Sequence, residues 1–274
     1  MRANMSGYRI GIVGCAGRMG QMLVREVTGT AGCTLAGGTE APGNAAVGSD
    51  IGEISGVGPL QMKIGGDAAA LFAAADAVID FTSPKATLAH ARLAAEAHKV
   101  LVIGTTGLTP ADESAIAEAA KRTAIVRSPN MSLAVNLLLA LTERVAQSLG
   151  PDYDIEIFEI HHRHKVDAPS GTALALGEAA ARGRQVKHAD VAVRGRDGHT
   201  GARPAGAIGF TSARGGGEVG DHVVMFCGEG ERVELTHRAT GRQIYARGAV
   251  KAALWARGRP AGLYSMKDVL GLDR

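Results

Sequence analysis

The segment Tyr8-Arg9-Ile10-Gly11-Ile12-Val13-Gly14-Cys15-Ala16-Gly17-Arg18-Met19-Gly20 decides the fold of this chain. A short, mostly apolar run typical of a buried β-strand leads into a turn with glycine at every third position. The residues after the turn repeat their apolar side chains with helical spacing. A strand, a glycine turn and a helix in this order open a dinucleotide-binding α/β fold. Because Ala16 stands where the usual fingerprint has its second glycine, the alternative is a glycine turn that only packs the helix on the strand.

Predicted strands and helices alternate after the glycine turn. A strand from Thr34 to Thr39 ends at Glu40, 20 residues after Gly20, where the fold places the carboxylate that binds a ribose. Buried strands are also predicted at 76–81 and 100–103, and each is followed by a helix that begins at a proline. Alternation of this kind predicts a parallel sheet with helices on both faces.

Small or polar residues follow three of the strands expected in this sheet. They are Phe81-Thr82-Ser83, Gly104-Thr105-Thr106-Gly107 and Ser128-Pro129-Asn130-Met131. Ligands of open α/β sheets bind at the carboxyl ends of the strands, so we expect these segments to line a cofactor cleft. The alternative is that they are plain turns and helix entries. In the cofactor interpretation Arg18 contacts a phosphate; in the alternative it is a solvated surface residue.

The second half of the chain has a different pattern. After a long apolar helix predicted at 133–149, strands are predicted at 154–160, 208–211, 223–226 and 232–236 with few helices between them, which indicates a more antiparallel sheet. Arg214 to Glu218, with three consecutive glycines, is predicted to be a mobile loop. A further helix is predicted from Arg242 to Trp255.

The segment Glu159-Ile160-His161-His162-Arg163-His164-Lys165-Val166-Asp167-Ala168-Pro169-Ser170-Gly171-Thr172 combines imidazoles, fixed cations and hydroxyls in one turn. That mixture suits a proton donor beside a small anion. A predicted strand leads into the segment and a predicted helix begins after it, so Ser170, Gly171 and Thr172 lie at a helix N-terminus. Unpaired backbone N–H groups and the positive end of the helix dipole make such a terminus a site for a carboxylate or phosphate.

Two other uses of this segment are less favoured by its sequence. A metal site at His161, His162 and His164 is opposed by the adjacent cations and by the absence of a cysteine pair or a His-Glu-x-x-His helix, so we expect no metal. A serine nucleophile at Ser170 is opposed by the absence of a Gly-x-Ser-x-Gly motif. The remaining histidines are interpreted as surface or satisfied core groups: His90, His98, His188, His199, His222 and His237.

Length and composition exclude several classes of protein. A chain of 274 residues is long enough to form two domains. Its content of 46% hydrophobic and 21% charged residues is typical of a globular protein. A net charge of +3 with scattered basic residues argues against a nucleic-acid surface. The sequence has no apolar run of membrane-spanning length and no signal-peptide pattern. Cys15, Cys33 and Cys227 have no metal-ligand spacing, so we expect reduced thiols in a cytoplasmic protein.

These motifs, in this order, resemble the 4-hydroxy-tetrahydrodipicolinate reductase family, also called dihydrodipicolinate reductases, of diaminopimelate and lysine biosynthesis. The resemblance covers essentially the whole chain, and its most specific part is the segment 159–173. It implies an α/β protein with an N-terminal Rossmann-type parallel sheet domain at 1–132, completed by the C-terminal helix within 242–274. It also implies a central α+β domain at 133–241, with a mixed, mostly antiparallel sheet, that binds substrate and forms a homotetramer.

The resemblance also implies a reaction and its residues. A hydride would pass from NADH or NADPH to a cyclic imine dicarboxylate, giving tetrahydrodipicolinate, with His161 as general acid and Lys165 holding a carboxylate and stabilising developing charge. Substrate contacts are expected at His162, Ser170, Gly171, Thr172 and Arg242. Cofactor contacts are expected at Gly14, Cys15, Ala16, Gly17, Arg18, Met19, Glu40, Phe81, Gly104, Thr105, Thr106, Ser128, Pro129, Asn130 and Met131.

One position departs from the family pattern. Members that accept a 2′-phosphate usually carry arginine directly after the ribose carboxylate, and this chain has Ala41 there. The departure predicts that NADH serves at least as well as NADPH, unless Arg18 compensates. Two other functions stay open: another Rossmann oxidoreductase of imino or amino acids, and a regulator that senses NAD(P) without turnover. Neither would need the His161-His162-x-x-Lys165 segment.

Overall fold

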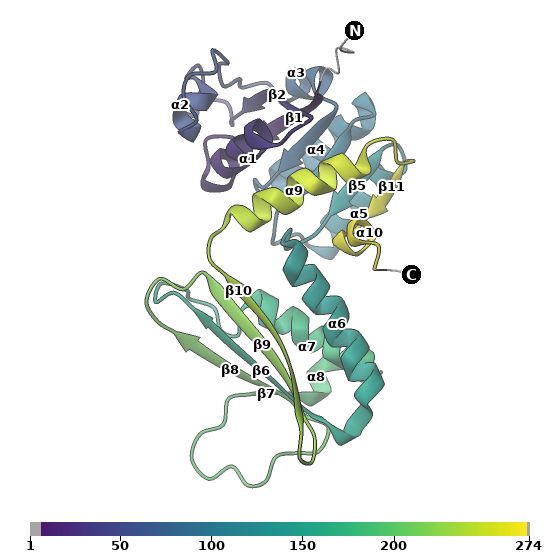
Figure 1. Cartoon of the computed structure of the whole chain (residues 1–274). Helices are drawn as coiled ribbons and strands as arrows, with labels where there is room; N and C mark the ends of the chain where they lie inside the picture. Colours follow the sequence, from purple (N-terminus) through teal and green to yellow (C-terminus); the bar gives the residue numbers. More distant parts are fainter. Residues whose placement is uncertain (1–6, 273–274) are drawn as a thin grey trace. The chain divides into compact units, whose positions relative to one another are not determined.

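The computed structural model describes residues 7–272, which form two compact units (Figure 1). The first unit contains the residues up to Ser132 and those from Gln243 onward, and the second runs from Leu133 to Arg242. The first unit is therefore discontinuous along the chain, with the second inserted between its two parts.

A six-stranded, fully parallel sheet forms the centre of the first unit, with the strand order β11-β5-β4-β3-β1-β2. Its strands are β1 (Tyr8–Val13), β2 (Cys33–Thr39), β3 (Ala77–Asp80), β4 (Val100–Ile103), β5 (Ala124–Arg127) and β11 (Gly262–Tyr264). All four residues of β3 are buried, as expected of a strand that is covered on both faces. The chain runs from β1 to β2 on one side and to β3 on the other, so the order reverses at β1. This arrangement confirms the predicted Rossmann-type fold.

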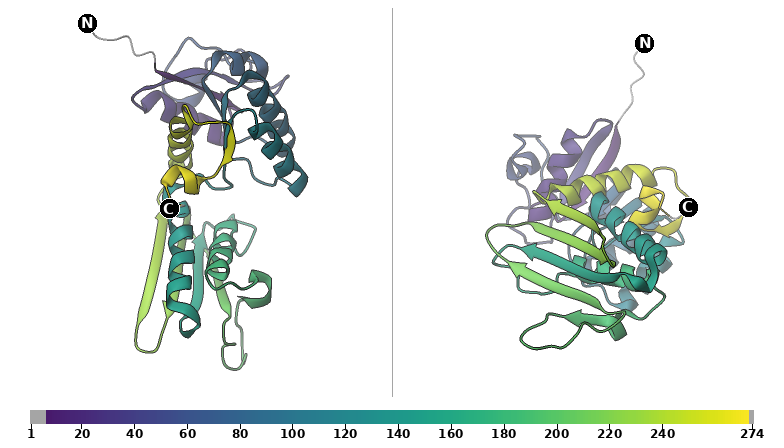
Figure 2. Two further views of the ribbon diagram at one scale, coloured as in Figure 1. Left: turned by 90° about the vertical axis from the view of Figure 1, so that its right-hand side faces the viewer. Right: turned by 60° about the horizontal axis from the view of Figure 1, so that its bottom comes forward.

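Helices cover both faces of this sheet (Figures 1 and 2). The helices α1 and α9 pack against each other, while α3, α4 and α5 form the layer on the opposite face. The helices of the unit are α1 (Arg18–Gly29), α2 (Ile51–Ser55), α3 (Ala68–Ala74), α4 (Pro84–Ala97), α5 (Pro110–Ala120), α9 (Gln243–Ala256) and α10 (Met266–Leu270). The C-terminal part of the chain thus supplies a helix over β3, β4 and β5 and also an edge strand, β11.

The start of α5 illustrates how the sequence sets these boundaries. Thr109 accepts a hydrogen bond from the Asp112 amide at 3.2 Å, and the Asp112 carboxylate accepts one from the Thr109 amide at 2.8 Å. Pro110 occupies the first helical position, where its missing N–H costs nothing. This reciprocal capping box is encoded entirely by local sequence.

The second unit packs helices on one face of a five-stranded sheet with the order β10-β9-β6-β8-β7. Its elements are α6 (Leu133–Leu149), a 3₁₀ turn at Gly150–Asp152, β6 (Asp154–His161), α7 (Gly171–Gly183), α8 (His188–Val191), β7 (Ala192–Arg194), β8 (Ile208–Arg214), β9 (Gly220–Cys227) and β10 (Arg232–Ala239). Alternate residues of β6 and β9 are buried, including Ile155, Ile157, Val224 and Phe226, and they join apolar residues of α6 and α7 in one core.

The sheet of the second unit is mixed, as predicted, and more of its residue pairs are antiparallel than parallel. The pairs β10–β9 and β9–β6 are antiparallel, whereas β6–β8 and β8–β7 are parallel. The chain leaves β6 through α7 before it returns as β8, and a crossover of this kind makes the two strands parallel. The sequence pattern predicted β6, β8, β9, β10 and the helix after Ser170, but it showed neither β7 nor which strands pair.

None of the helices between residues 7 and 272 combines the length and the apolar character needed to span a bilayer.

We predict that Gly248→Ala destabilises the first unit strongly. A Cβ at Gly248, in the middle of α9, would lie 1.7 Å from the backbone oxygen of Met131, so α9 would have to move. Overpacking of this kind costs about 3 kcal/mol at the upper end of its usual range. The matched control is Gly29→Ala at the end of α1, where a Cβ meets nothing within 4 Å and should stabilise by up to about 1 kcal/mol. Urea denaturation measures both, and equal stabilities would contradict the close packing of α9.

Candidate active site

The glycine loop lies at the carboxyl end of β1, where the strand order reverses. Gly14 has a φ of 68°, and a Cβ there would lie 2.8 Å from the Thr82 side chain. A Cβ at Gly20 would lie 2.1 Å from the Gly14 backbone oxygen. Both positions therefore require glycine, the first for its conformation and the second for close packing of α1 against the loop. The middle position, Ala16, tolerates a side chain and is partly exposed.

The N-terminus of α1 is open to an anion. Gly17 is the N-cap, and among the described residues no side chain caps the helix and no acidic residue lies in its first turn. The first N–H groups of a helix have no intrahelical partners, and the helix dipole adds a partial positive charge there. Arg18 adds an exposed cation at the same place. These features fit a phosphate group.

Glu40 is held beside the glycine loop by two hydrogen bonds. One carboxylate oxygen accepts from the Ala16 amide at 2.8 Å, and the other accepts from the Asn44 side-chain amide at 3.1 Å. Asn44, which we did not select from the sequence, thus helps to fix the predicted ribose ligand. Ala41 follows it as an exposed, uncharged residue.

A buried carboxylate organises the ends of β3 and β4. Asp80 accepts hydrogen bonds from the Thr82 amide at 2.8 Å, the Thr82 hydroxyl at 2.6 Å and the Thr105 hydroxyl at 3.3 Å. His90 Nδ1 lies 2.8 Å from its other oxygen, so His90 is a satisfied core group, as interpreted from the sequence. Burial opposes ionisation of Asp80, but the bonds from His90 and Thr82 outweigh it and lower the pKa of the carboxyl group.

The other predicted cofactor residues include a buried group and an exposed group. Phe81 lies against Gly104, where a Cβ would come within 2.3 Å of the ring. The Ser128 hydroxyl donates to the Asn130 carbonyl at 2.7 Å, which shapes the turn after β5. The buried members are Cys15, Gly104, Thr105, Ser128 and Met131, and the exposed members are Gly17, Arg18, Thr106 and Pro129. The buried group shapes the loops, and the exposed group remains accessible to a ligand.

Glu159 organises the turn of the second unit. Its side chain is 1% exposed. It accepts two hydrogen bonds from the Arg214 guanidinium at 2.9 Å each, one from His161 Nδ1 at 2.5 Å and one from the Ser170 amide at 3.2 Å. Burial alone would raise the pKa of Glu159, but the hydrogen bonds from Arg214, Ser212 and His161 lower it to about 2. The carboxylate is therefore ionised at neutral pH.

His161 is buried beside this carboxylate. An ionised carboxylate only accepts, so Nδ1 carries the hydrogen and Nε2 is the free ring nitrogen. Nε2 faces Gly220, where a Cβ would lie only 2.6 Å from it. Burial lowers the pKa of His161 below its ordinary value; Glu159 opposes that effect, and the positive charges of Lys165 and Arg214 add to it.

His222 belongs to the same cluster; it is buried, but its place beside His161 was not predicted from the sequence. It lies directly opposite Glu159 in the pairing of β6 with β9, and its ring centroid is 5.1 Å from that of His161. Its Nε2 is hydrogen-bonded to the Ser170 hydroxyl at 3.0 Å. Burial, with a smaller contribution from His161, lowers the pKa of His222 to about 4. His222 lies two residues before Val224 and four before Phe226, so it shares their buried side of β9. We did not use this alternation in the sequence analysis.

Ser170 is the N-cap of α7. Its hydroxyl accepts from the Ala173 amide at 3.1 Å, and the residue is 2% exposed. The hydroxyl is thus occupied by the helix and His222, while Gly171 is exposed and Thr172 is partly exposed at the first two helical positions. The exposed part of this helix N-terminus is therefore its backbone rather than the serine side chain.

Lys165 is available to a carboxylate. Its ammonium group donates to both oxygens of Asp167, at 2.8 and 2.9 Å, and Asp167 is exposed. The hydrogen bond from Lys165 is the main cause of the lowered pKa of Asp167. A two-oxygen contact of this kind is the geometry that a ligand carboxylate would adopt in place of Asp167.

The glycine-rich segment predicted to be a mobile loop from Arg214 is tied to this turn. Arg214 is the last residue of β8 and binds Glu159, which the sequence analysis missed. After it, the Gly215 amide donates to the His161 carbonyl at 2.9 Å, and the His162 amide donates to the Glu218 carbonyl at 2.7 Å. These long-range pairings were not predicted from the sequence.

The remaining expected site residues are less constrained. Arg242 is exposed and forms no ion pair or side-chain hydrogen bond with a residue in the range 7–272. His162 is partly buried, with its ring centroid 6.2 Å from that of His164. Across the described part of the chain, no group of three or more His, Cys, Asp or Glu side chains is arranged to hold a metal ion.

Comparison with protein families identifies the chain. The family model described as dihydrodipicolinate reductase, N-terminus, matches residues 8–131, and the model described as dihydrodipicolinate reductase, C-terminus, matches residues 134–270. The chain belongs to the dihydrodipicolinate reductase family. The resemblance inferred from the sequence motifs is confirmed.

Individual members of the dihydrodipicolinate reductase family match over nearly the whole chain. The 4-hydroxy-tetrahydrodipicolinate reductase of Rhodopseudomonas palustris (strain BisB18) is 55% identical and covers 98% of this chain and 99% of its own. The 4-hydroxy-tetrahydrodipicolinate reductase of Brucella abortus (strain 2308) is 56% identical, and the match covers 96% of this chain and 98% of that protein. The structure of a dipicolinate-bound dihydrodipicolinate reductase from Paenisporosarcina sp. TG-14 has the same fold, with a TM-score of 0.76, 24% identity and coverage of 94% and 97%.

We predict that Glu159 makes the fold sensitive to acid. The pKa of Glu159 is about 2 in the fold and about 4.5 ordinarily, so its stabilising contribution is complete above about pH 5 and is lost as the pH falls toward 2. Glu159→Gln should be less stable than wild type at neutral pH but should lose less stability between pH 5 and pH 2. Urea denaturation at a series of pH values measures this. The exposed Glu178→Gln should follow wild type, and parallel curves for wild type and Glu159→Gln would contradict the prediction.

Proposed function

We propose that this chain reduces 4-hydroxy-tetrahydrodipicolinate to tetrahydrodipicolinate with a hydride from NADH or NADPH and a proton, releasing the 4-hydroxyl group as water, in lysine and diaminopimelate biosynthesis. The observation that carries the proposal is the buried pair of Glu159 and His161 beside Lys165 and the N-terminus of α7. A proton donor, a cation and a helix N-terminus are what reduction of a dicarboxylate requires. Membership of the family and the names of relatives at 55–56% identity support the same reaction.

The glycine-loop edge of the first unit fits the cofactor. The open N-terminus of α1 and Arg18 would hold the phosphates, and Glu40 would accept hydrogen bonds from the adenosine ribose. The turns at Gly104-Thr105-Thr106 and Ser128-Pro129-Asn130-Met131 would line the rest of the site. The reduced nicotinamide supplies the hydride.

Lys165, Gly171 and Thr172 would bind the two substrate carboxylates. Lys165 would exchange Asp167 for one carboxylate, and the backbone N–H groups of Gly171 and Thr172 at the start of α7 would face the other. We include Ser170 as the residue that holds this helix end in place, and His162 and Arg242 as additional contacts. Lys165 would also stabilise negative charge that develops as electrons move into the substrate.

His161 would deliver the proton from Nε2. Glu159 fixes the ring with Nδ1 turned toward itself, which leaves Nε2 as the only nitrogen available. Without substrate, burial and nearby cations lower the pKa of His161. A bound dianion would reverse that effect, because an opposite charge nearby favours the protonated imidazole. Substrate binding would therefore raise the protonated fraction of His161, which is the form that the reaction consumes.

A homotetramer formed through the second unit is part of the proposal. The face of the sheet opposite to α6 and α7 carries the partly exposed Phe158, Ile160, Val223 and Met225, which alternate with the core residues. An apolar sheet face of this kind fits self-association. A cytoplasmic location is also proposed, since Cys15, Cys33 and Cys227 are all free.

A coupled assay tests the proposed activity. The purified chain should oxidise NADH only when aspartate semialdehyde, pyruvate and the synthase that precedes this step are all present. The full set minus the synthase is the control for unspecific oxidation. A folded preparation that binds NADH but shows no turnover in the complete mixture would favour a sensor of the cofactor over an enzyme.

We predict that Lys165→Ala lowers kcat/KM at least ~100-fold, because preorganised charge stabilisation is typically worth that much. NADH binding, followed by fluorescence, should stay within about twofold of wild type. His161→Gln should lose less activity, since water replaces part of a general-acid contribution of ~10²–10⁴. Lys187→Ala, an exposed lysine at the start of α8, is the charge-matched control and should retain activity. Loss of NADH affinity in Lys165→Ala would place Lys165 in the cofactor site instead.

We predict that NADH serves at least as well as NADPH and that Ala41→Arg shifts the preference toward NADPH. Glu40 accepts hydrogen bonds but would repel a 2′-phosphate, and Ala41 offers no cation to offset this. A hydrogen bond to a charged group is worth ~1.5–3 kcal/mol, so the ratio of kcat/KM values should change by roughly 10- to 150-fold. Steady-state kinetics with both cofactors measure it. If the wild type prefers NADPH tenfold or more, Arg18 is the residue that offsets the charge of the 2′-phosphate.

A further inference from the structure

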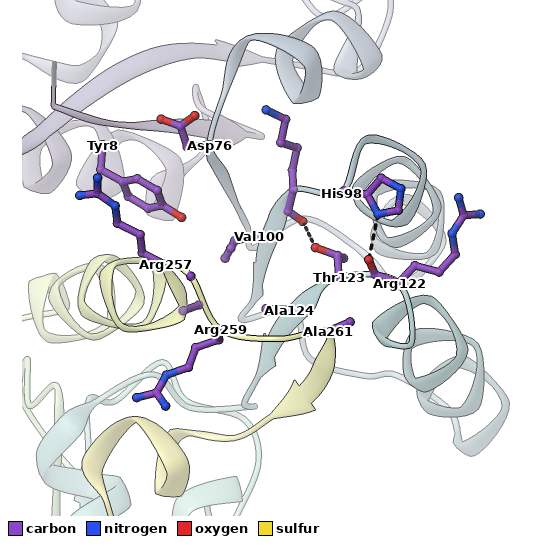
Figure 3. A pocket seen from close by; sticks show the side chains of 13 residues that line it. Tyr8, Asp76, His98, Val100, Arg122, Thr123, Ala124, Arg257, Arg259 and Ala261 are labelled. Carbon is purple, nitrogen blue, oxygen red and sulfur yellow. Dashed lines mark hydrogen bonds between the residues drawn. The ribbon is translucent and has the colours of Figure 1, made fainter.

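The first unit has a cavity at the amino edge of its parallel sheet (Figure 3). It has a volume of about 530 Å³, within the range of small-molecule sites of roughly 300–1,000 Å³. Tyr8 at the start of β1, Val100 at the start of β4 and Ala124 at the start of β5 contribute to its walls. The glycine loop lies at the carboxyl end of these strands. Six residues of β1 span roughly 20 Å, so the cavity is separate from the proposed cofactor site.

Four fixed cations surround this cavity without acidic partners. Lys99, Arg122, Arg257 and Arg259 line it, and none forms an ion pair with a residue between 7 and 272. The one carboxylate of the cavity, Asp76, is already bound by Arg9 at 2.7 Å. In the second unit, by contrast, the clustered arginines are paired, as Arg196 and Arg203 are with Glu156 and Arg214 is with Glu159.

Helix ends account for only part of this positive charge. The cavity lies where α4, α5 and α9 end, and each helix C-terminus carries about −0.5 of an elementary charge, which favours a nearby cation. Three helix ends offset about 1.5 of the four fixed charges. About 2.5 positive charges remain, which matches a ligand with two or more negative charges.

The frame of the cavity is fixed by hydrogen bonds between connections. The Thr123 hydroxyl donates to the Lys99 carbonyl at 2.8 Å, and His98 Nδ1 lies 3.0 Å from the Arg122 carbonyl (Figure 3). These two bonds join the α4–β4 connection to the α5–β5 connection. Arg122 lines one side of the cavity, and Arg257 and Arg259 line the other (Figure 3).

Aromatic rings support the two arginines that follow α9. The Arg257 guanidinium lies 5.3 Å from the ring centroid of Tyr8, and that of Arg259 lies 4.3 Å from the ring of Trp255. A stacked guanidinium keeps the hydrogen-bond donors in its plane available. The Tyr8 hydroxyl points into the cavity (Figure 3), and burial raises the pKa of Tyr8 to about 12, so it stays a donor.

We propose that this cavity binds a compact organic molecule with at least two negative charges, a polycarboxylate or a phosphate ester. Arg257 and Arg259 would bind its anionic groups, with Arg122 and Lys99 closing the opposite side. Tyr8, Val100 and Ala124 would contact the body of the ligand. The site is distinct from the reaction site and makes the first unit able to respond to a second metabolite.

Trp255 gives a direct readout, because it is the only tryptophan of the chain and Arg259 lies on it. Pyrophosphate represents phosphate esters and citrate represents carboxylates, with acetate at equal ionic strength as the monoanion control. We expect saturable changes in Trp255 fluorescence with pyrophosphate, citrate or both, and none with acetate. The probe that binds more tightly identifies the ligand class. Higher salt should weaken binding, since exposed charges are screened beyond about 10 Å at 0.1 M.

Variants locate the site. Arg257→Gln with Arg259→Gln should weaken probe binding about 100-fold, at about tenfold for each arginine. Calorimetry measures the affinity of this variant for the probes, because the substitutions change the environment of Trp255 and so alter its fluorescence directly. Ala261→Glu, which adds a carboxylate at the exposed rim without removing a contact, should weaken binding at least about tenfold. Arg92→Gln with Lys251→Gln removes two exposed charges from the same unit outside the cavity and should have no more than a twofold effect.

Two outcomes would overturn the proposal. One is the absence of saturable binding by wild type of either probe up to about 10 mM at low salt. The other is equal weakening in the Arg92→Gln/Lys251→Gln control, which would indicate unspecific charge attraction. Arg18→Gln separates this site from the glycine loop, because it should leave binding at the cavity unchanged. A loss confined to Arg18→Gln would place the anion at the glycine loop instead.

Discussion

One buried carboxylate, that of Glu159, holds together the turn between β6 and α7. Three groups from different parts of the second unit meet at it: a ring from the end of β6, a guanidinium from the end of β8 and the amide that precedes α7. Removing a carboxylate from water is expensive, and only a full set of donors offsets that cost. The full set of donors is also what fixes the imidazole, the helix N-terminus and the end of β8 in one arrangement.

The first unit uses the same device at a different place. Asp80 is buried at the end of β3 and is satisfied by two hydroxyls, an amide and His90. There the imidazole lies in the core and the carboxylate shapes loops, whereas in the second unit the second nitrogen of the imidazole faces Gly220. Each unit therefore has an internal ionic centre that sets the loops at strand ends, and the roles of the two histidines differ because of what their free nitrogens face.

Much of the fold was predictable because its signals are local. The glycine turn, the prolines at helix starts and the apolar strands predicted the first unit, and the pattern around Ser170 predicted the helix N-terminus there. The remaining features depend on contacts between distant residues. His222 faces His161 only through the pairing of β9 with β6, and Arg214 reaches Glu159 only through the pairing of β8 with β6. Short elements such as β11 and α10 were also missed, since three to five residues carry little periodicity.

The discontinuous first unit has a consequence for the order in which the protein is made. Its sheet lacks the edge strand β11 and the helix α9 over β3, β4 and β5 until the 110 residues from Leu133 to Arg242 have been synthesised. At ~5–20 residues per second, the nascent sheet waits about 5–20 s with one apolar face uncovered. The second unit, which is continuous, can fold during that interval. The residues of the second unit are therefore all synthesised before the unit that begins first can be completed.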